Sequence, residues 1–163
     1  MNMTEEDRVK KAHIALMKHP ETALYSGVMM MGETAVDDEK GVTAYTDGVN
    51  KKYGRGFMDA LTDEEVNALV LHENLHIVFR HLLHNRDLFE ENRMLANMAA
   101  DYVVNGMIED MDVNGKLAEL PEGALVDSQY KGLNTKQVFD LLKQQGKDGE
   151  GQGGDSGEGG NYT

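Results

Sequence analysis

Residues 62–79 read TDEEVNALVLHENLHIVF, and this stretch decides the fold of the chain. Thr62 and Glu65 have the spacing of a capping box, in which each side chain bonds the backbone N–H of the other residue at the start of a helix. Apolar residues then follow nearly all round the predicted helix, which indicates that it is buried rather than lying on the surface. Two histidines and a glutamate nevertheless interrupt this apolar stretch.

These polar residues are His72, Glu73 and His76, which form an HExxH pattern. Residues i and i+4 lie one turn apart on the same helix face, so both imidazoles can reach one metal ion. The pattern is typical of zinc sites in which the glutamate acts as general base on zinc-bound water. The alternative is a pair of core histidines hydrogen-bonded to the backbone, beside an ion-paired glutamate.

A catalytic zinc ion needs a third protein ligand, and the central helix does not supply one. His81 lies about 180° round the helix from His72, and His84 lies roughly 12 Å along the axis from His76. The metzincin pattern is ruled out because Leu82 occupies the position of its third histidine. The following helix is therefore the best source of a third ligand.

That helix, predicted over residues 90–110, carries a polar stripe. Asn97, Asp101 and Asn105 fall at i, i+4 and i+8 in a segment otherwise rich in alanine, valine and methionine. A carboxylate in such surroundings should have a raised pKa or a partner, and a zinc ion would serve as that partner. Asp101 is therefore the favoured third ligand, while the two asparagines are expected to support the ligands or the packing.

Different assignments of the third ligand remain open from the sequence. Glu90 or Glu91 could supply it, although both lie in a more polar stretch that should be exposed. The chain could also supply no third ligand at all. Asp101 itself could be a structural carboxylate that pairs with Arg93 or caps a neighbouring loop.

Two further helices have local start signals. Thr4 is the predicted N-cap of the first helix, and Pro20 follows the end of that helix. A last short helix is predicted over residues 135–142, with Asn134 or Thr135 as its cap. Each of these helices carries apolar residues at helical spacing, so each should pack one face against the core.

Strand signals replace the helical periodicity between the first helix and the central one. Residues 28–31 form a short apolar run, residues 37–41 have the composition of a turn, and residues 42–46 carry β-branched side chains. Asp47 and Gly48 then form a tight-turn dipeptide. We therefore predict an α+β fold with a small antiparallel sheet, a buried HExxH helix and a packed helix that bears the third ligand.

Composition excludes several classes of protein. The chain has 163 residues, 16 basic and 29 acidic side chains, a net charge of −13 and no cysteine. Without cysteine there is no disulfide, no Cys-ligated zinc and no Cys nucleophile. The negative charge argues against nucleic-acid binding. No apolar run reaches the roughly 18 residues that span a bilayer, and no signal peptide is recognisable, so we expect a cytoplasmic protein without a membrane partner.

Two charged segments lie outside the predicted helices, one at the C-terminal end and one before the central helix. Residues 145–163 are Gly-rich and acidic and cannot bury enough apolar surface to offset chain entropy, so we predict a disordered tail or truncated linker after a folded domain of residues 4–144. Lys51, Lys52 and Arg55 form a small basic patch before the central helix. This patch is either a solvated loop or a contact for a substrate carboxylate.

Two stretches carry a family resemblance: LVLHENLHIVFRH at residues 69–81 and NMAADYVVNGMI at residues 97–108. They resemble the family described as a putative metallopeptidase domain, which occurs in bacteria and their phages, typically N-terminal to a VWA-like domain. The resemblance covers most of residues 4–144. It includes the TDG turn at residues 46–48 and the QVFDLL helix at residues 137–142, and the acidic tail is similar to that family's interdomain linker.

The resemblance implies a zincin-like fold and a zinc-dependent metallopeptidase. It implies His72 and His76 as metal ligands, Glu73 as catalytic base and Asp101, from the A-A-D-x-x-x-N segment, as third ligand. The implied substrate is a peptide or protein. In zincins an edge strand before the active helix often holds extended substrate, and residues 42–46 are the candidate here.

Two other functions fit the same residues. The chain could be a non-catalytic metal-binding scaffold in which the zinc ion is structural. It could instead be an interaction module of an AAA-ATPase and VWA-type system, with a VWA-like domain or an AAA ATPase as its partner. An open coordination position at the metal would favour the enzyme, and a fourth protein ligand would favour the scaffold.

Overall fold

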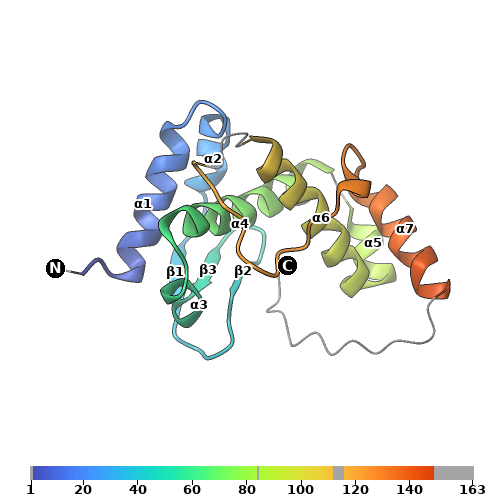
Figure 1. Cartoon of the computed structure of the whole chain (residues 1–163), viewed down its shortest axis with the longest axis horizontal. Helices are drawn as coiled ribbons and strands as arrows, with labels where there is room; N and C mark the ends of the chain where they lie inside the picture. The colour runs from blue at the N-terminus through green and yellow to red at the C-terminus, as the bar shows by residue number, and fades with distance from the viewer. Residues whose placement is uncertain (1, 84, 112–115, 149–163) are drawn as a thin grey trace.

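The computed structural model describes residues 2–83, 85–111 and 116–148, which form an α+β fold (Figure 1). In chain order, the helices and strands are α1 (Glu5–Lys18), the 3-10 helix η1 (Ala23–Tyr25), α2 (Ser26–Met29), β1 (Thr34–Asp37), β2 (Ala44–Thr46), β3 (Lys51–Gly54), α3 (Arg55–Asp59), α4 (Asp63–Leu83), α5 (Arg86–Glu91), α6 (Arg93–Met111), η2 (Ser128–Tyr130) and α7 (Thr135–Asp148). None of the helices within these ranges is long and apolar enough to cross a membrane.

The three strands form one sheet in the order β1-β3-β2. Strands β2 and β3 are antiparallel and are joined by the predicted turn, where Gly48 has a positive φ of 99° that favours glycine. Strand β1 runs parallel to β3, so the sheet is mixed and the prediction of an antiparallel sheet was wrong for this strand. The reason is that the chain crosses to the far edge after β1 and returns through β2 to the middle position.

The prediction of a strand at residues 28–31 was also wrong, because the run lies in and just after helix α2. A short apolar run does not by itself distinguish a strand from a buried helical turn. Met29 is 4% exposed and Met30 is 76% exposed, so only one residue of the run contributes to the core. Helix α2 packs against α1 and α4.

The predicted starts of α1 and α4 are confirmed. The Asp7 N–H donates to Thr4 Oγ1 at 3.2 Å at the start of α1. At the start of α4, the Glu65 N–H donates to Thr62 Oγ1 at 3.2 Å and the Thr62 N–H donates to Glu65 Oε1 at 3.0 Å. This reciprocal pair satisfies two donors that the helix itself leaves unpaired.

Helix α7 begins as predicted but ends later. The Gln137 N–H donates to Asn134 Oδ1 and the Asn134 N–H donates to Gln137 Oε1, both at 2.9 Å, so Asn134 is the cap. The helix continues to Asp148, so residues 145–148 are helical, although their composition resembles that of the tail. The rest of the predicted tail, residues 149–163, lies outside the described residues.

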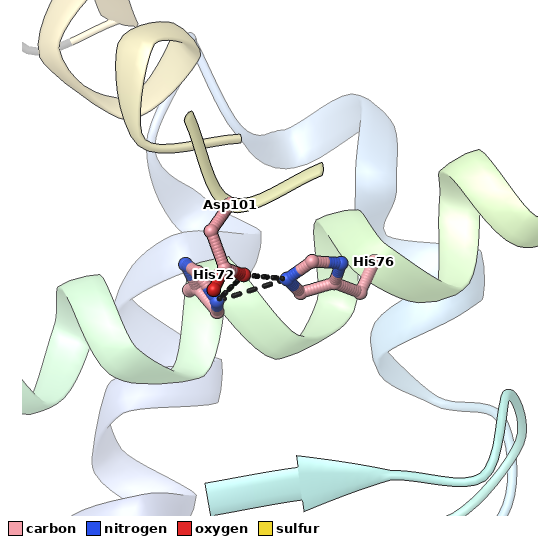
Figure 2. Close-up of side chains that lie close together, drawn as sticks. All are labelled: His72, His76 and Asp101. Carbon is pink, nitrogen blue, oxygen red and sulfur yellow. Dashed lines mark hydrogen bonds and ion pairs between the residues drawn. The ribbon is translucent and has the colours of Figure 1, made fainter. Parts of the chain in front are cut away.

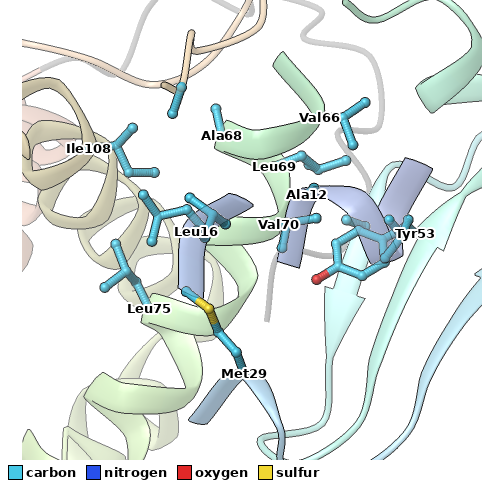
Figure 3. Close-up of a cluster of buried hydrophobic side chains, with 14 of the residues drawn as sticks. Ala12, Leu16, Met29, Tyr53, Val66, Ala68, Leu69, Val70, Leu75 and Ile108 are labelled. Atoms are coloured by element: carbon cyan, nitrogen blue, oxygen red, sulfur yellow. The ribbon is translucent and has the colours of Figure 1, made fainter. Parts of the chain in front are cut away.

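The buried apolar side chains form two cores. The N-terminal core lies around α4, between α1, the sheet and the second half of α6 (Figure 3); it contains Val9, Ala12, Leu16, Met29, Ala44, Tyr53, Met58, Val66, Ala68, Leu69, Val70, Leu71, Leu75, Val104, Ile108 and Ala118. The C-terminal core lies between α5, the first half of α6 and α7; it contains Leu88, Ala96, Ala99, Tyr130, Val138, Phe139 and Leu142. Helix α6 thus contributes to both cores and connects them.

Candidate metal centre

His72 and His76 lie on one face of α4, and Asp101 of α6 faces them (Figure 2). Asp101 Oδ1 is 2.9 Å from His76 Nε2 and 3.3 Å from His72 Nε2, and the two Nε2 atoms are 2.9 Å apart. The three residues are between 4% and 7% exposed. Across the described ranges, no second group of three such donors converges in this way.

This donor set fits a divalent metal ion. Two imidazole nitrogens and one carboxylate oxygen are the protein ligands of many catalytic zinc sites. With metal–ligand bonds of about 2.0–2.1 Å in tetrahedral geometry, ligand atoms lie roughly 3.3 Å apart. The three atoms already lie near that spacing, so side-chain adjustments of a few tenths of an ångström would suffice. The structure thus brings the three proposed ligands together, and metal binding by them stays a prediction.

The three side chains also shift one another's pKa values. Burial alone would raise the pKa of Asp101, but hydrogen bonds from His72 and His76 outweigh it and lower that pKa. Burial alone would lower the pKa of His72, but the hydrogen bond to Asp101 and its charge raise it. Two nitrogens 2.9 Å apart need a proton between them. A divalent cation would replace that proton, so metal binding here should strengthen as pH rises.

Glu73 follows His72 on α4 and is fully buried. It is not one of the three converging donors. Its charge adds to the effect of burial in holding the pKa of the Tyr53 hydroxyl well above its ordinary value, and it also raises the pKa of His72. Glu73 therefore interacts electrostatically with Tyr53 of strand β3 and with His72. It lies beside the three donors rather than among them.

The two carboxylates considered in place of Asp101, Glu90 and Glu91, lie elsewhere. Both are exposed on the short helix α5. Arg86 Nε donates to Glu90 Oε1 at 3.1 Å, and Lys143 of α7 forms an ion pair with Glu91. The structure does not bring either carboxylate into the buried cluster, which disfavours both as third ligand.

Arg93 is exposed at the start of α6, and its proposed pairing with Asp101 is not formed, because the buried carboxylate bonds the two histidines instead. On the polar stripe of the same helix, Asn105 bonds His72, whereas Asn97 Oδ1 is buried without a hydrogen-bond partner among the described residues. His84 and the side chain of His81 lie outside the described residues.

Both interpretations of the basic patch, a solvated loop or a substrate contact, were wrong for Lys51, which is fully buried. Its Nζ donates to the Met29 carbonyl at 2.8 Å and to Asn74 Oδ1 at 2.9 Å, and burial lowers the pKa of Lys51 to about 8. The Asn74 amide in turn donates to His13 Nε2 at 3.3 Å. Period-two alternation could have placed Lys51 inward, because Tyr53 is buried and Lys52 between them is exposed.

Arg55, the third member of the patch, is also engaged within the protein. It forms ion pairs with Glu6 of α1 and with Asp38 after β1. These pairs hold the first turn of α3 against the N-terminal helix and the loop that follows β1. Arg55 therefore does not present an unpaired charge to a substrate.

Comparison with known proteins assigns a family to the chain. The model of the family described as "Putative metallopeptidase domain" matches residues 4–162. No curated protein and no solved structure matches the chain. The match spans every element from α1 to α7, including α4 and α6 with their converging side chains. Such a family implies a metal ion, and the buried cluster offers three ligands for one.

Proposed function

This chain belongs to the putative metallopeptidase domain family, and from that premise we propose that it is a zinc-dependent metallopeptidase, a hydrolase of peptide bonds. The observation that carries the proposal is the meeting of two imidazoles and one carboxylate at a single buried point. The glutamate that a hydrolytic mechanism needs follows the first of those histidines directly on the same helix.

His72, His76 and Asp101 would hold the metal ion. When bound there, such an ion would supply Lewis-acid chemistry: polarisation of the scissile carbonyl group and a lowered pKa, about 7, for water. Because α4 fixes both histidines one turn apart and α6 presents the carboxylate from the opposite side, the ligand set is arranged by packing between two helices rather than by a loop.

Glu73 would act as the general base. Its carboxylate takes a proton from the attacking water and later delivers that proton to the leaving amine. Full burial keeps the carboxylate away from bulk solvent, where proton exchange would compete with transfer to the substrate. Its position directly after His72 on a rigid helix fixes it relative to the ligands.

Strand β2 would hold the substrate. It is an edge strand, since the sheet order is β1-β3-β2, and it packs against α4. An extended peptide could add to its outer edge through main-chain hydrogen bonds. This arrangement of an edge strand beside an HExxH helix is the basis on which we class the fold as zincin-like.

One observation favours a structural metal instead. All three proposed ligands are nearly inaccessible, whereas a catalytic ion must accept a substrate group in its open position. In that case the chain would be a non-catalytic metal-binding scaffold rather than a hydrolase. The two functions differ in whether Glu73 is needed for anything beyond folding.

The test uses the full chain with Glu73→Gln and, as its control on the same helix, the exposed Glu64→Gln. We expect about one zinc ion per chain in all three proteins by elemental analysis. With a fluorogenic peptide library, Glu73→Gln should lower hydrolysis about 10²–10⁴-fold, while Glu64→Gln should leave it unchanged. Glutamine is nearly isosteric but cannot accept the proton.

Two results would contradict this proposal. Wild-type protein that contains no metal and binds none on titration would refute the ligand set. Protein that binds zinc tightly but hydrolyses no peptide would support the structural scaffold. If the proposal is right, His72→Ala and His76→Ala should abolish the zinc content measured by elemental analysis.

A further inference from the structure

The side chain of Asn105 reaches the ring of His72 from one turn after Asp101 on α6. Asn105 Oδ1 is 2.8 Å from His72 Nδ1, the ring nitrogen that does not face the other two ligands. Both residues are buried, with Asn105 3% and His72 5% exposed. The contact joins α6 to α4 beside the donor cluster and is separate from the cluster's own hydrogen bonds.

The orientation of the Asn105 amide is set by a second contact. Its Nδ2 group donates to the Leu125 carbonyl oxygen at 3.0 Å. A carbonyl oxygen only accepts, so the amide nitrogen must face Leu125 and the amide oxygen must face His72. That oxygen also only accepts, so His72 Nδ1 must carry a hydrogen. In the neutral ring, Nε2 is then left with its lone pair.

Leu125 lies in a stretch of chain, residues 116–127, that also contacts helix α4. Near the start of this stretch, Asn67 Nδ2 donates to the Leu117 carbonyl at 2.9 Å and the Glu119 N–H donates to the Glu64 carbonyl at 3.0 Å. The same helix that carries the two histidines therefore anchors the segment that orients the asparagine. Contacts thus run from α4 to residues 117–119, from Leu125 to Asn105 of α6, and from Asn105 back to His72 of α4.

We propose that Asn105 is a positioning residue that fixes His72 in the Nδ1–H tautomer, so that Nε2 is its metal-binding atom. The metal part rests on the proposed function, whereas the tautomer is a property of the fold and can be measured without metal. If the hydrogen moved to Nε2, the atom that lies 2.9 Å from His76 Nε2 could no longer offer a lone pair.

The experiment compares wild type with Asn105→Ala, Asn105→Asp and, as the matched control, Asn97→Ala. Asn97 lies two turns earlier on the same polar stripe, and its buried Oδ1 makes no hydrogen bond in the described part of the chain. Long-range ¹H–¹⁵N NMR spectra of the chelator-treated full chain, recorded above the titration of His72, report which ring nitrogen carries hydrogen. Chelator competition gives the zinc affinity.

We expect the Nδ1–H tautomer in wild type, in Asn97→Ala and in Asn105→Asp, because the aspartate keeps an acceptor oxygen. Asn105→Ala should shift hydrogen towards Nε2 and weaken zinc binding about 10–100-fold, the usual cost of losing such a partner. If Asn105→Ala does not fold, Asn105→Leu fills the same space without an acceptor and should show the same change.

An unchanged Nδ1–H tautomer in Asn105→Ala or Asn105→Leu would overturn the inference. An equal shift in Asn97→Ala would overturn it as well, because the effect would then follow from loosening α6 in general. A tautomer that depends on Asn105 in a protein that binds no zinc would support the positioning role and refute the metal site, so the two proposals fail separately.

Discussion

The N-terminal core and the C-terminal core differ in how they treat polar side chains. Around α4 the protein buries a lysine, a glutamate, an aspartate and three histidines, each at a cost that hydrogen bonds must offset. In α5, η2 and α7, the only buried polar residue among those described is Thr135. The difference indicates that function is concentrated at α4, and that the C-terminal core serves as an apolar support.

Asp101 lies where the two cores meet. On α6, Ala96 and Ala99 pack in the C-terminal core, while Val104 and Ile108 pack in the N-terminal core. The third proposed ligand is therefore held by a helix that both cores fix, whereas the two histidines belong to the N-terminal core alone. A bound metal ion would connect the two regions across α4 and α6.

The largest expected effect comes from removing that connection. A structural zinc site is worth roughly 10–16 kcal/mol, so loss of one of three ligands in Asp101→Ala should weaken zinc binding on the order of a thousandfold. Asp101→Asn should weaken it less, because the amide oxygen can still bind the ion, although a neutral amide is a poorer ligand than a carboxylate. Chelator competition measures both affinities, and thermal unfolding with and without zinc measures how far the ion stabilises the chain.

Glu90→Ala and Glu91→Ala are the controls for that experiment, since both carboxylates are exposed on α5. Neither should change zinc affinity. If Glu91→Ala weakened binding as much as Asp101→Ala did, the assignment of the third ligand to α6 would be wrong.

The next effect compares the two cores directly by matched cavities. Leu16 of α1 and Leu88 of α5 are both almost fully buried, one in each core. Leucine-to-alanine substitutions in such positions cost about 2–5 kcal/mol, and more where the surroundings cannot collapse. We expect Leu16→Ala to lie at the upper end in urea unfolding and Leu88→Ala at the lower end, because the C-terminal core contains fewer buried apolar residues.

A reversed order of these two costs would break the comparison. The comparison would also fail if Leu16→Ala and Leu88→Ala had identical urea transitions and lost the same amount of bound zinc. Cooperative unfolding of the whole chain is the usual behaviour of a domain of this size, and a second transition in Leu88→Ala alone would show that the C-terminal core unfolds separately.

The helices of the site could be predicted because their signals are local. The capping box of Thr62 and Glu65 marks the start of α4, and the four-residue spacing on α6 already aligned Asp101 with Asn105. Whether α6 lies against α4 is not a local property, but the separation of 25 positions from His76 to Asp101 allows a reversal and a return helix. The spacing therefore predicted the meeting of these side chains, although not their distances.

The features that sequence could not predict depend on distant segments. The parallel pairing of β1 with β3 is set by how the chain crosses the sheet, which no residue of β1 records. For Lys51 the alternation along β3 was a signal, but lysine is rarely buried, and the partners that make its burial tolerable, Asn74 and the Met29 carbonyl, lie on distant segments. The Leu125 carbonyl that orients Asn105 lies in a segment without regular structure, where no periodicity exists to guide a prediction.

A smaller effect should appear in the pH dependence of stability. The pKa of Lys51 is about 8 in the folded protein and about 10.5 when the chain is unfolded. Between these values the unfolded chain holds the proton and the folded one does not, so the free energy of unfolding should rise with pH, by at most about 3 kcal/mol. Lys51→Met should remove this rise.

The measurement is urea unfolding at several pH values between about 8 and 10, reported as the difference between wild type and variant. Lys52→Met, on the exposed face of the same strand, is the control and should keep the wild-type dependence. His13, the titratable neighbour in the same network, has a pKa lowered by burial and does not titrate in this range. A Lys51→Met protein with the full wild-type rise would show that another group causes it.

The smallest effect separates the two cores most cleanly, because their main helices begin with the same device. Thr62→Ala removes the cap of α4 and Asn134→Ala removes the cap of α7, and each should cost about 1 kcal/mol. Since α4 crosses the polar N-terminal core, Thr62→Ala should lower the stability of the whole chain. Since α7 packs only in the C-terminal core, Asn134→Ala should lower hydrogen-exchange protection in α7 and leave protection in α4 unchanged. Equal loss of protection in both helices in Asn134→Ala would mean that the cores unfold as one unit, and the apolar support would then be as essential to the site as the helix that carries its histidines.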